Sequence, residues 1–208
     1  MPSECHNHGS RFFGNSIIMH IGLFFGSFNP IHIGHLAIAS YIAQFTELSK
    51  VWFVVSPHNP LKEKQTLLKD YHRLAMVKAA VENISYLNAC DIEFNLPQPS
   101  YTINTLAHLE EKYPQHTFSL ILGSDNLTSL HKWKNHEIII ERHKLFVYPR
   151  PEVALTAWHT HSKVQLIDAP RMDISSTFIR NLIKEGKDAQ CFMPRQSWEY
   201  LDEMNFYK

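Results

Sequence analysis

Cysteine is scarce in this chain of 208 residues, and long apolar runs are absent. Cys5, Cys90 and Cys191 form no C-x-x-C pair, and three widely spaced cysteines do not make a disulfide framework. We therefore expect a protein of the reducing cytoplasm. No stretch reaches about 18 consecutive apolar residues, so the sequence predicts no membrane-spanning helix and no membrane partner.

An excess of charge of either sign is also missing. Lys and Arg together number 20, Asp and Glu together number 20, and the formal net charge is zero. Proteins that act on nucleic acid usually carry a basic surface, so we expect no nucleic-acid partner, although a small basic pocket remains compatible with this balance. Histidine is the abundant ionisable residue, with 14 copies that titrate near neutral pH.

The sequence predicts one domain that is preceded by a short N-terminal extension. Residues 1–18 are polar and aperiodic, so we expect an extension outside the fold, and residues 19–208 then form the domain. Apolar runs predict strands at 20–25, 50–55, 87–94, 117–122, 144–148 and 164–167. Helical periodicity predicts helices at 34–44, 70–82, 100–112, 126–131, 136–142, 175–185 and 195–205.

This alternation predicts an α/β fold. Strands separated by helices form a parallel sheet with right-handed crossovers, which places helices on both faces in a Rossmann-like arrangement. The last two helices form a small C-terminal helical part. Ligands of such sheets bind at the carboxyl ends of the strands, and several polar motifs follow those ends in this sequence.

The first motif is G-S-F-N-P-I-H-I-G-H, which starts at Gly26 and ends at His35. Gly26 permits a tight exit from the first strand, and the following helix begins near His32. His32 and His35 are three residues apart, so they share one side of the helix at its positive end. A helix N-terminus with two imidazoles is suited to a polyphosphate, whereas two exposed histidines on a capped helix are the alternative.

The second motif is I-S-S-T-F-I-R, from Ile174 to Arg180. Ser175 or Ser176 can cap the helix, and the hydroxyls and amides there can bind phosphate oxygens. Arg180 lies one turn later and can reach the same oxygens. Taken alone, the motif also fits an ordinary serine-capped helix with a surface arginine.

Together the two motifs resemble the nucleotidyltransferase superfamily that carries H-x-G-H and I-S-S-T-x-x-R. Members transfer a nucleotidyl group from ATP or CTP to a phosphate or a similar acceptor. Three further segments narrow the resemblance to nicotinate-mononucleotide adenylyltransferases. They are the loop with Asn59 and Lys62, the S-Y-T segment of Ser100, Tyr101 and Thr102, and the G-S-D segment of Gly123 and Asp125 followed by Trp133.

The resemblance implies transfer of AMP from ATP to nicotinate mononucleotide, and to nicotinamide mononucleotide as a further acceptor, giving deamido-NAD and pyrophosphate. His32, His35 and Arg180 would be the catalytic residues, and Lys62 would contact phosphates. Gly26, Ser27 and Phe28 would lie along the nucleotide, with Ile174, Ser175 and Ser176 on its other side. Asn59, the S-Y-T segment, Gly123, Asp125 and Trp133 would bind the acceptor, with Trp133 stacking on the pyridine.

Phosphate oxygens attack and leave in this reaction, so no general base is needed and catalysis rests on positioning and charge neutralisation. Mg²⁺ would arrive with ATP and be held largely by the phosphates rather than by protein carboxylates.

The sequence is compatible with a homo-oligomer. The alternatives are another transferase of the superfamily, such as pantetheine-phosphate adenylyltransferase, and a non-catalytic nucleotide-binding module.

Each acceptor-side residue also has an ordinary structural explanation. Ser100 and Asp125 are good helix caps, and Trp133 is a residue type that is usually buried. Asn29, inside the first motif, stands where many relatives carry Asp.

Overall fold

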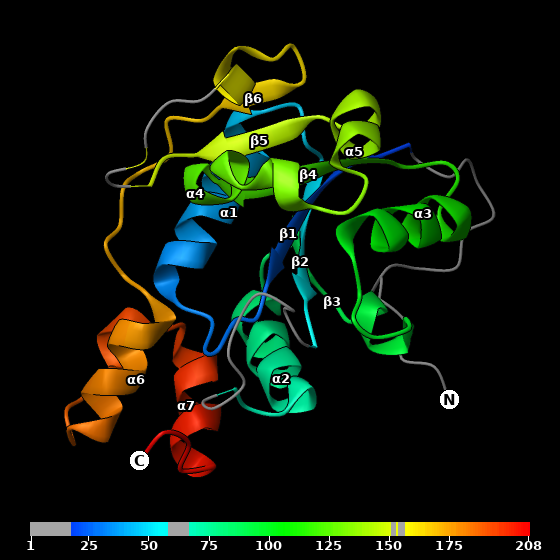
Figure 1. Ribbon diagram of the computed structural model, residues 1–208. Coiled ribbons are helices and arrows are strands. Elements are labelled where there is room, and N and C mark those ends of the chain that lie inside the picture. The colour runs from blue at the N-terminus through cyan, green and yellow to red at the C-terminus, as the bar shows by residue number, and fades with distance from the viewer. Residues whose placement is uncertain (1–17, 58–66, 151–152, 154–156) are drawn as a thin grey trace.

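A six-stranded parallel sheet forms the centre of the molecule in a computed structural model that describes residues 18–57, 67–150, 153 and 157–208 (Figure 1). The strand order is β3-β2-β1-β4-β5-β6, so the order reverses between β1 and β4. The strands are β1 His20–Gly26, β2 Lys50–Val55, β3 Leu87–Cys90, β4 Thr117–Gly123, β5 Leu145–Tyr148 and β6 Val164–Leu166. The predicted parallel α/β sheet is confirmed.

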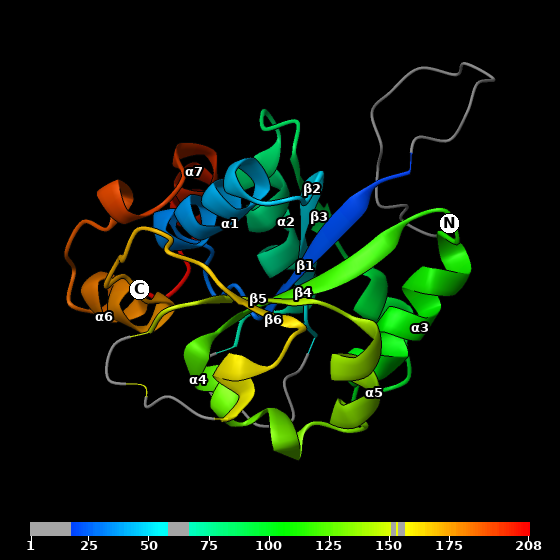
Figure 2. The same ribbon diagram turned by 90° about the horizontal axis from the view of Figure 1, so that it is seen from above.

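Helices cover both faces of the sheet, as predicted (Figure 2). Helices α1 and α2 lie on one face, and α3, α4 and α5 lie on the other. The α-helices are α1 Ile33–Phe45, α2 Asp70–Val81, α3 Thr102–Lys112, α4 Ser124–Thr128, α5 His136–Arg142, α6 Ser176–Lys184 and α7 Arg195–Glu203. Short 3-10 helices are η1 Ile92–Asn95, η2 Leu130–Lys132, η3 Ala157–Thr160 and η4 Gln190–Phe192.

The central strand β2 shows why its run is continuously apolar. Val51, Phe53 and Val55 pack into the core beneath α1 and α2, whereas Trp52 and Val54 face the core beneath α3 and α5. Alternate side chains thus enter two separate cores, which is the mark of a strand buried on both faces. Truncating Phe53, which is fully buried, would cost about 3–5 kcal/mol of stability.

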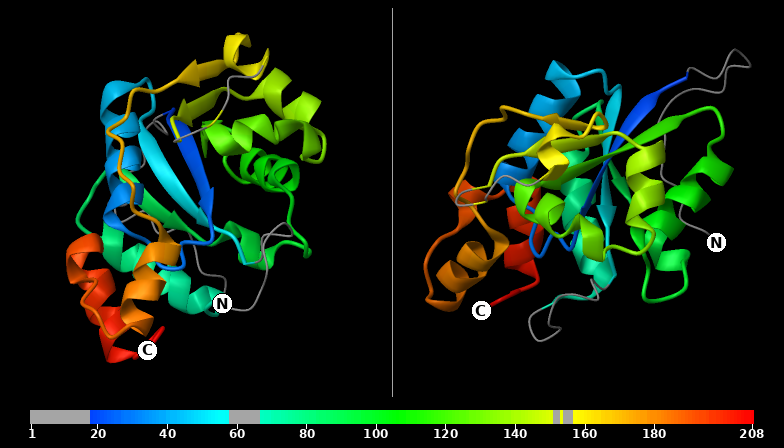
Figure 3. Two further views of the ribbon diagram at one scale, coloured as in Figure 1. Left: turned by 60° about the vertical axis from the view of Figure 1, so that its left-hand side comes forward. Right: turned by 45° about the horizontal axis from the view of Figure 1, so that its top comes forward.

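Helices α6 and α7 form the predicted C-terminal helical part. They lie side by side at one end of the molecule in both views of Figure 3, and α7 packs against α2. The Ser197 hydroxyl donates to the carbonyl of Met76 at 2.7 Å, which ties α7 to α2 inside the core. No helix in the described part of the chain is long and apolar enough to cross a bilayer.

Four predicted elements had a boundary wrong by two residues or more, and one of them is the helix expected at 195–205, which ends at Glu203. The strand expected at 87–94 ends at Cys90, and the chain then forms η1, which turns Glu93 inward. Helix α3 begins at Thr102 rather than at residue 100, because Ser100 bonds to Glu93 instead of capping the helix. The helix expected at 126–131 is two short elements, α4 and η2, that break at Ser129.

Candidate active site

A cavity of about 600 Å³ opens at the carboxyl ends of β1 and β4, where the strand order reverses. This is the position at which parallel α/β sheets bind their ligands. Predicted residues that line it are Gly26, Ser27, Phe28, His32, His35, Ser100, Tyr101, Thr102, Gly123, Asp125, Trp133, Ile174, Ser175, Ser176 and Arg180. The predicted residues Asn59 and Lys62, and residues 1–17 of the N-terminal extension, lie outside the described residues.

The loop after β1 is shaped by the pair Gly26 and Phe28. Phe28 has a left-handed backbone, with φ of 44°, and its ring is buried. A Cβ atom on Gly26 would lie 2.7 Å from that ring, so only glycine fits there without displacing Phe28. The Phe28 ring in turn contacts His35 edge to face, with ring centroids 5.1 Å apart. This packing fixes one wall of the cavity.

His32 and His35 stack on each other at the start of α1, with ring centroids 3.6 Å apart and an angle of 25° between the rings. The backbone N–H of His32 donates to Nδ1 of His35 at 3.3 Å. A neutral His35 therefore carries its proton on Nε2, which makes that atom the donor. Two imidazolium rings this close would repel each other, so the pair accommodates one positive charge far better than two.

His32 is buried, and its Nδ1 atom has no hydrogen-bond partner among the described residues. Burial, with a smaller contribution from the positive charge of Arg150, lowers the pKa of His32 to about 4. The ring is therefore neutral at pH 7 in the absence of an anion. A buried polar atom without a partner costs free energy unless a ligand satisfies it, which is the property expected of a binding residue.

The N-terminus of α6 lines the same cavity as the histidines and lies next to the start of α1. Ser175 caps this helix, since its hydroxyl accepts the N–H of Phe178 at 3.1 Å. The Ser176 hydroxyl donates to the carbonyl of Pro30 at 2.8 Å. This hydroxyl proton therefore binds the β1–α1 loop and is not available to a phosphate. Arg180 donates through Nη1 to the carbonyl of Asn29 at 2.8 Å, and its guanidinium retains further N–H groups at the cavity wall.

Glu93, which the sequence analysis missed, lies beneath the S-Y-T segment. It is 3% exposed and accepts hydroxyl protons from Thr105 at 2.7 Å and Ser100 at 3.2 Å. Burial raises the pKa of Glu93, and hydrogen bonds from Thr105, Ser56 and Ser100 oppose that rise. The Ser100 proton is thus committed to Glu93. The sequence signal was a second acid, two residues after Asp91, inside a segment that we assigned to a strand.

The cavity also has an aromatic surface and a further cation. Trp133 is half-buried, lines the cavity and packs against the core beneath α3 and α5. The Lys134 ammonium lies 4.7 Å from the centre of the Tyr101 ring. Asp125 is exposed and lies 3.9 Å from Arg150, so its carboxylate is accessible from the cavity.

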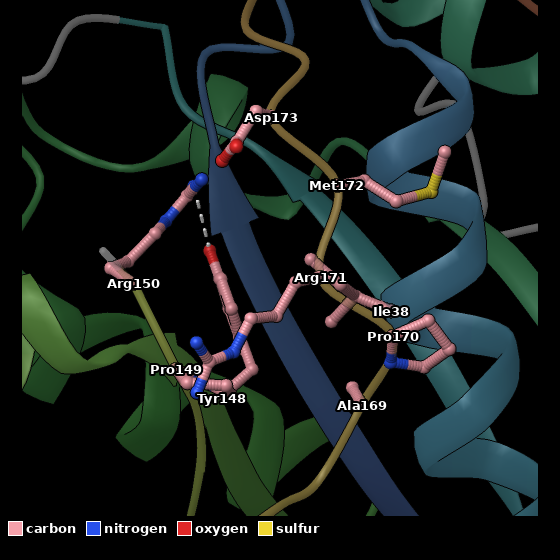
Figure 4. Close-up of a pocket in the computed structure, with 9 residues that line it drawn as sticks. All are labelled: Ile38, Tyr148, Pro149, Arg150, Ala169, Pro170, Arg171, Met172 and Asp173. Carbon is pink, nitrogen blue, oxygen red and sulfur yellow. Dashed lines mark hydrogen bonds between the residues drawn. The ribbon is translucent and has the colours of Figure 1, made fainter.

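Arg150 is another residue that the sequence analysis missed. Its Nη2 donates to the hydroxyl of Tyr148 at 3.1 Å, and its guanidinium lies over the Tyr148 ring (Figure 4). Arg150 and Tyr148 line both the main cavity and a small neighbouring pocket of about 20 Å³ that also contains Asp173. The sequence signal for Arg150 was its position two residues after the end of β5, at the same sheet edge as Gly26 and Gly123.

Arg73, also missed, lies fully buried on α2 and joins the loops around the cavity. It donates to four carbonyl oxygens, at 2.6–3.0 Å, which belong to Ser27, Ser56, Pro57 and Leu68. Burial lowers the pKa of Arg73. Arg73 is one of three charged residues on α2, so no pattern in the sequence set it apart.

Comparison with known proteins agrees with this geometry. The family model described as cytidylyltransferase-like matches residues 23–182. The probable nicotinate-nucleotide adenylyltransferase of Flavobacterium johnsoniae is 57% identical over 91% of this chain and 100% of its own length. The one of Bacteroides thetaiotaomicron is 44% identical over 88% of this chain and 90% of its own length.

A solved structure of Plasmodium falciparum nicotinic acid mononucleotide adenylyltransferase complexed with NaAD has the same fold. Its TM-score is 0.75 at 21% identity, covering 91% of this chain and 97% of that one. Sequence relatives spanning almost the whole chain, both motifs at one cavity and the shared fold thus lead to one conclusion: the chain belongs to the nicotinate-nucleotide adenylyltransferase family.

Proposed function

We propose that this protein transfers the AMP group of ATP to the 5′-phosphate of nicotinate mononucleotide, forming deamido-NAD and releasing pyrophosphate. The single observation that carries the proposal is the common cavity. It brings the histidine pair, the start of α6 and the S-Y-T segment, which are far apart in the sequence, to one sheet edge. The names of the curated relatives support the same reaction.

On the ATP side, His32 and His35 bind the phosphates. Because His35 carries its proton on Nε2, that atom can donate to a phosphate oxygen. The unpartnered Nδ1 of His32 becomes a second donor when an approaching anion raises the pKa of the His32 ring. Arg180 and Arg150 add positive charge at two walls of the cavity. The attacking oxygen belongs to a phosphate that is already ionised at pH 7, so these groups neutralise charge and orient reactants instead of removing a proton.

On the acceptor side, the backbone N–H groups at the start of α3 bind the nicotinate carboxylate. The hydroxyl proton of Ser100 is committed to Glu93, so the amides of Tyr101 and Thr102 are the better donors for an anion. Trp133 offers a flat surface for the pyridine ring, and Asp125 accepts hydrogen bonds from ribose hydroxyls.

Mg²⁺ enters as part of the ATP substrate. No group of three or more His, Cys, Asp or Glu side chains suited to a metal occurs in the described part of the chain. The cavity instead presents imidazole and guanidinium donors, which bind phosphate oxygens, so the phosphates themselves would be the ligands of Mg²⁺. We place the protein in the cytoplasm because its cysteine usage suits a reducing compartment.

Pyrophosphate release tests the proposal. The protein is incubated with MgATP and, in parallel, nicotinate mononucleotide, nicotinamide mononucleotide or phosphopantetheine, and a second series replaces ATP by CTP. We expect the highest kcat/KM with ATP and nicotinate mononucleotide. Preference for phosphopantetheine would support the alternative transferase, and release with none of the acceptors would support a non-catalytic nucleotide-binding module.

A further inference from the structure

The segment after α7, Asn205–Lys208, folds back against the molecule in a defined shape. Asn205 and Tyr207 both have left-handed backbones, with φ of 53° and 65°. The N–H of Phe206 donates to the carbonyl of Leu201 at 3.2 Å, and the Lys208 ammonium lies 2.9 Å from the Asp202 carboxylate. These bonds turn the segment, which we call the returning segment, back toward α2.

Aromatic packing holds the returning segment on α2. The Phe206 ring contacts the ring of His72 on α2, with centroids 4.6 Å apart, and both Phe206 and Tyr207 are half-buried. His72 also bonds the hydroxyl of Tyr200 at 2.9 Å, which joins α7 to the same place. The next side chain, Tyr207, therefore projects from a fixed base.

The Tyr207 hydroxyl donates to Oδ1 of Asn29 at 2.5 Å, although the two residues are 178 positions apart. Asn29 is 4% exposed and lies between Phe28 and His32 in the first motif. Its Oδ1 also accepts the N–H of Leu68 at 3.2 Å, and its carbonyl accepts Nη1 of Arg180 at 2.8 Å. Burial raises the pKa of Tyr207, so its phenol remains a hydrogen-bond donor throughout the physiological range.

We propose that Tyr207 is a positioning residue for the ATP side of the active site, acting through Asn29 on the loop that carries the histidine pair. The proposal rests on the proposed function for the identity of the nucleotide. Arg180 and Tyr207 hold opposite ends of Asn29, the carbonyl and the side chain. Losing the Tyr207 bond leaves the N–H of Leu68 on Oδ1 and loosens the loop in front of His32. The bonds of Asn29 described above join it to Leu68, Arg180 and Tyr207, and Arg180 is one of the residues that we assign to ATP.

The test compares Tyr207→Phe with Ser197→Ala. The first variant removes the hydroxyl on Asn29, and the second removes the hydroxyl bond from α7 to Met76 on α2, which involves neither Asn29 nor the returning segment. We measure kcat, the KM for ATP and for nicotinate mononucleotide, the calorimetric Kd for MgATP and the Tm. Tyr207→Phe should raise the KM and Kd for ATP about 3- to 10-fold and leave the KM for the acceptor unchanged.

A double variant measures the energetic coupling between Tyr207 and Asn29. If Tyr207 acts through Asn29, Tyr207→Phe should add less than twofold to the ATP Kd of Asn29→Ala. The proposal is overturned if Tyr207→Phe keeps the wild-type Kd for ATP, if it raises both KM values equally, or if Ser197→Ala has the same effect. Absence of adenylyl transfer by the wild-type protein would refute the proposed function instead, and the Kd for ATP would still decide the role of Tyr207.

Discussion

The guanidinium of Arg73 donates to the carbonyl of Ser27 at 2.6 Å, although 46 positions separate the two residues. Arg73 is fully buried, and Ser27 lies in the loop that leads to the histidine pair. Through its bonds to Ser56 and Pro57, the same guanidinium holds the loop after β2. One side chain of α2 thus sets the distance between two strand exits at the edge of the cavity.

Replacing Arg73 should therefore destabilise the protein strongly. Arg73→Met keeps the length of the side chain but leaves four carbonyls without their donor, and we expect a loss of at least about 3 kcal/mol in the free energy of unfolding. Arg73→Lys keeps the charge without the planar fork, so it should fall between Met and the wild type. Urea unfolding measures both, and a wild-type midpoint for Arg73→Met would contradict this role.

His35→Ala should lower turnover without unfolding the protein. Removing one donor directed at charge in the transition state typically costs about 10²–10³ in kcat, and His35 is only partly buried. His108→Ala, an exposed histidine on α3, is the matched control and should keep wild-type turnover. Stopped assays of deamido-NAD formation, with the Tm of each variant, measure the effect. Near-normal turnover of His35→Ala would contradict our assignment of the ATP phosphates.

The pKa of His32 makes stability depend on pH. Its folded value of about 4 lies below its ordinary value of 6.5, so between those pH values the unfolded chain binds more protons than the folded one. Stability should fall as the pH drops through this window, by up to roughly 3 kcal/mol from this residue. Urea unfolding at pH 7 and pH 4 measures the loss, and His32→Gln should lose less. Equal losses would contradict the assigned pKa.

Binding of ATP should reverse this effect on His32. A triphosphate beside the ring favours its charged form and raises its pKa, so the protein should take up protons when it binds MgATP at pH 5.5. Calorimetric titrations in two buffers with different ionisation enthalpies measure that uptake. The His32→Gln variant should take up fewer protons, and identical uptake by variant and wild type would place the ATP phosphates away from His32.

Glu93 should act on the acceptor side. In Glu93→Ala the buried hydroxyls of Thr105 and Ser100 lose their acceptor, which costs about 1–3 kcal/mol for each group left unsatisfied. Glu93→Gln retains an acceptor and should restore most of the stability. Because these hydroxyls hold the start of α3, both variants should raise the KM for nicotinate mononucleotide more than that for ATP. Steady-state kinetics measure this difference, and a change confined to ATP would contradict it.

Trp133→Ala should weaken acceptor binding, because it removes the flat surface at the cavity wall. We expect the KM for nicotinate mononucleotide to rise about 10-fold while the KM for ATP stays constant. Trp133→Phe keeps an aromatic surface and should retain most of the affinity. If only the KM for ATP changed in Trp133→Ala, the pyridine would have to bind elsewhere.

Much of the fold follows from local patterns in the sequence. The run from Lys50 to Val55 is apolar at every position after the first, which identified a strand buried on both faces. Two of the boundary errors arose where a buried polar residue overrode such a pattern. Glu93 turns inward to meet Thr105 and Ser100, so the chain leaves the strand at Cys90 and α3 starts at Thr102.

The sequence by itself determined the alternation of strands and helices and the two motifs, because each is written in neighbouring residues whose spacing decides their geometry. Only the tertiary structure decided the roles of Arg73, Glu93, Arg150 and Tyr207. For Arg73, Glu93 and Tyr207, the partners are carbonyls, hydroxyls and an amide oxygen on other segments, and Arg150 reaches the cavity because β5 ends at the same sheet edge as β1 and β4. A hydrogen bond of that kind depends on where two segments meet in space, so it cannot be predicted from the spacing of residues along the chain.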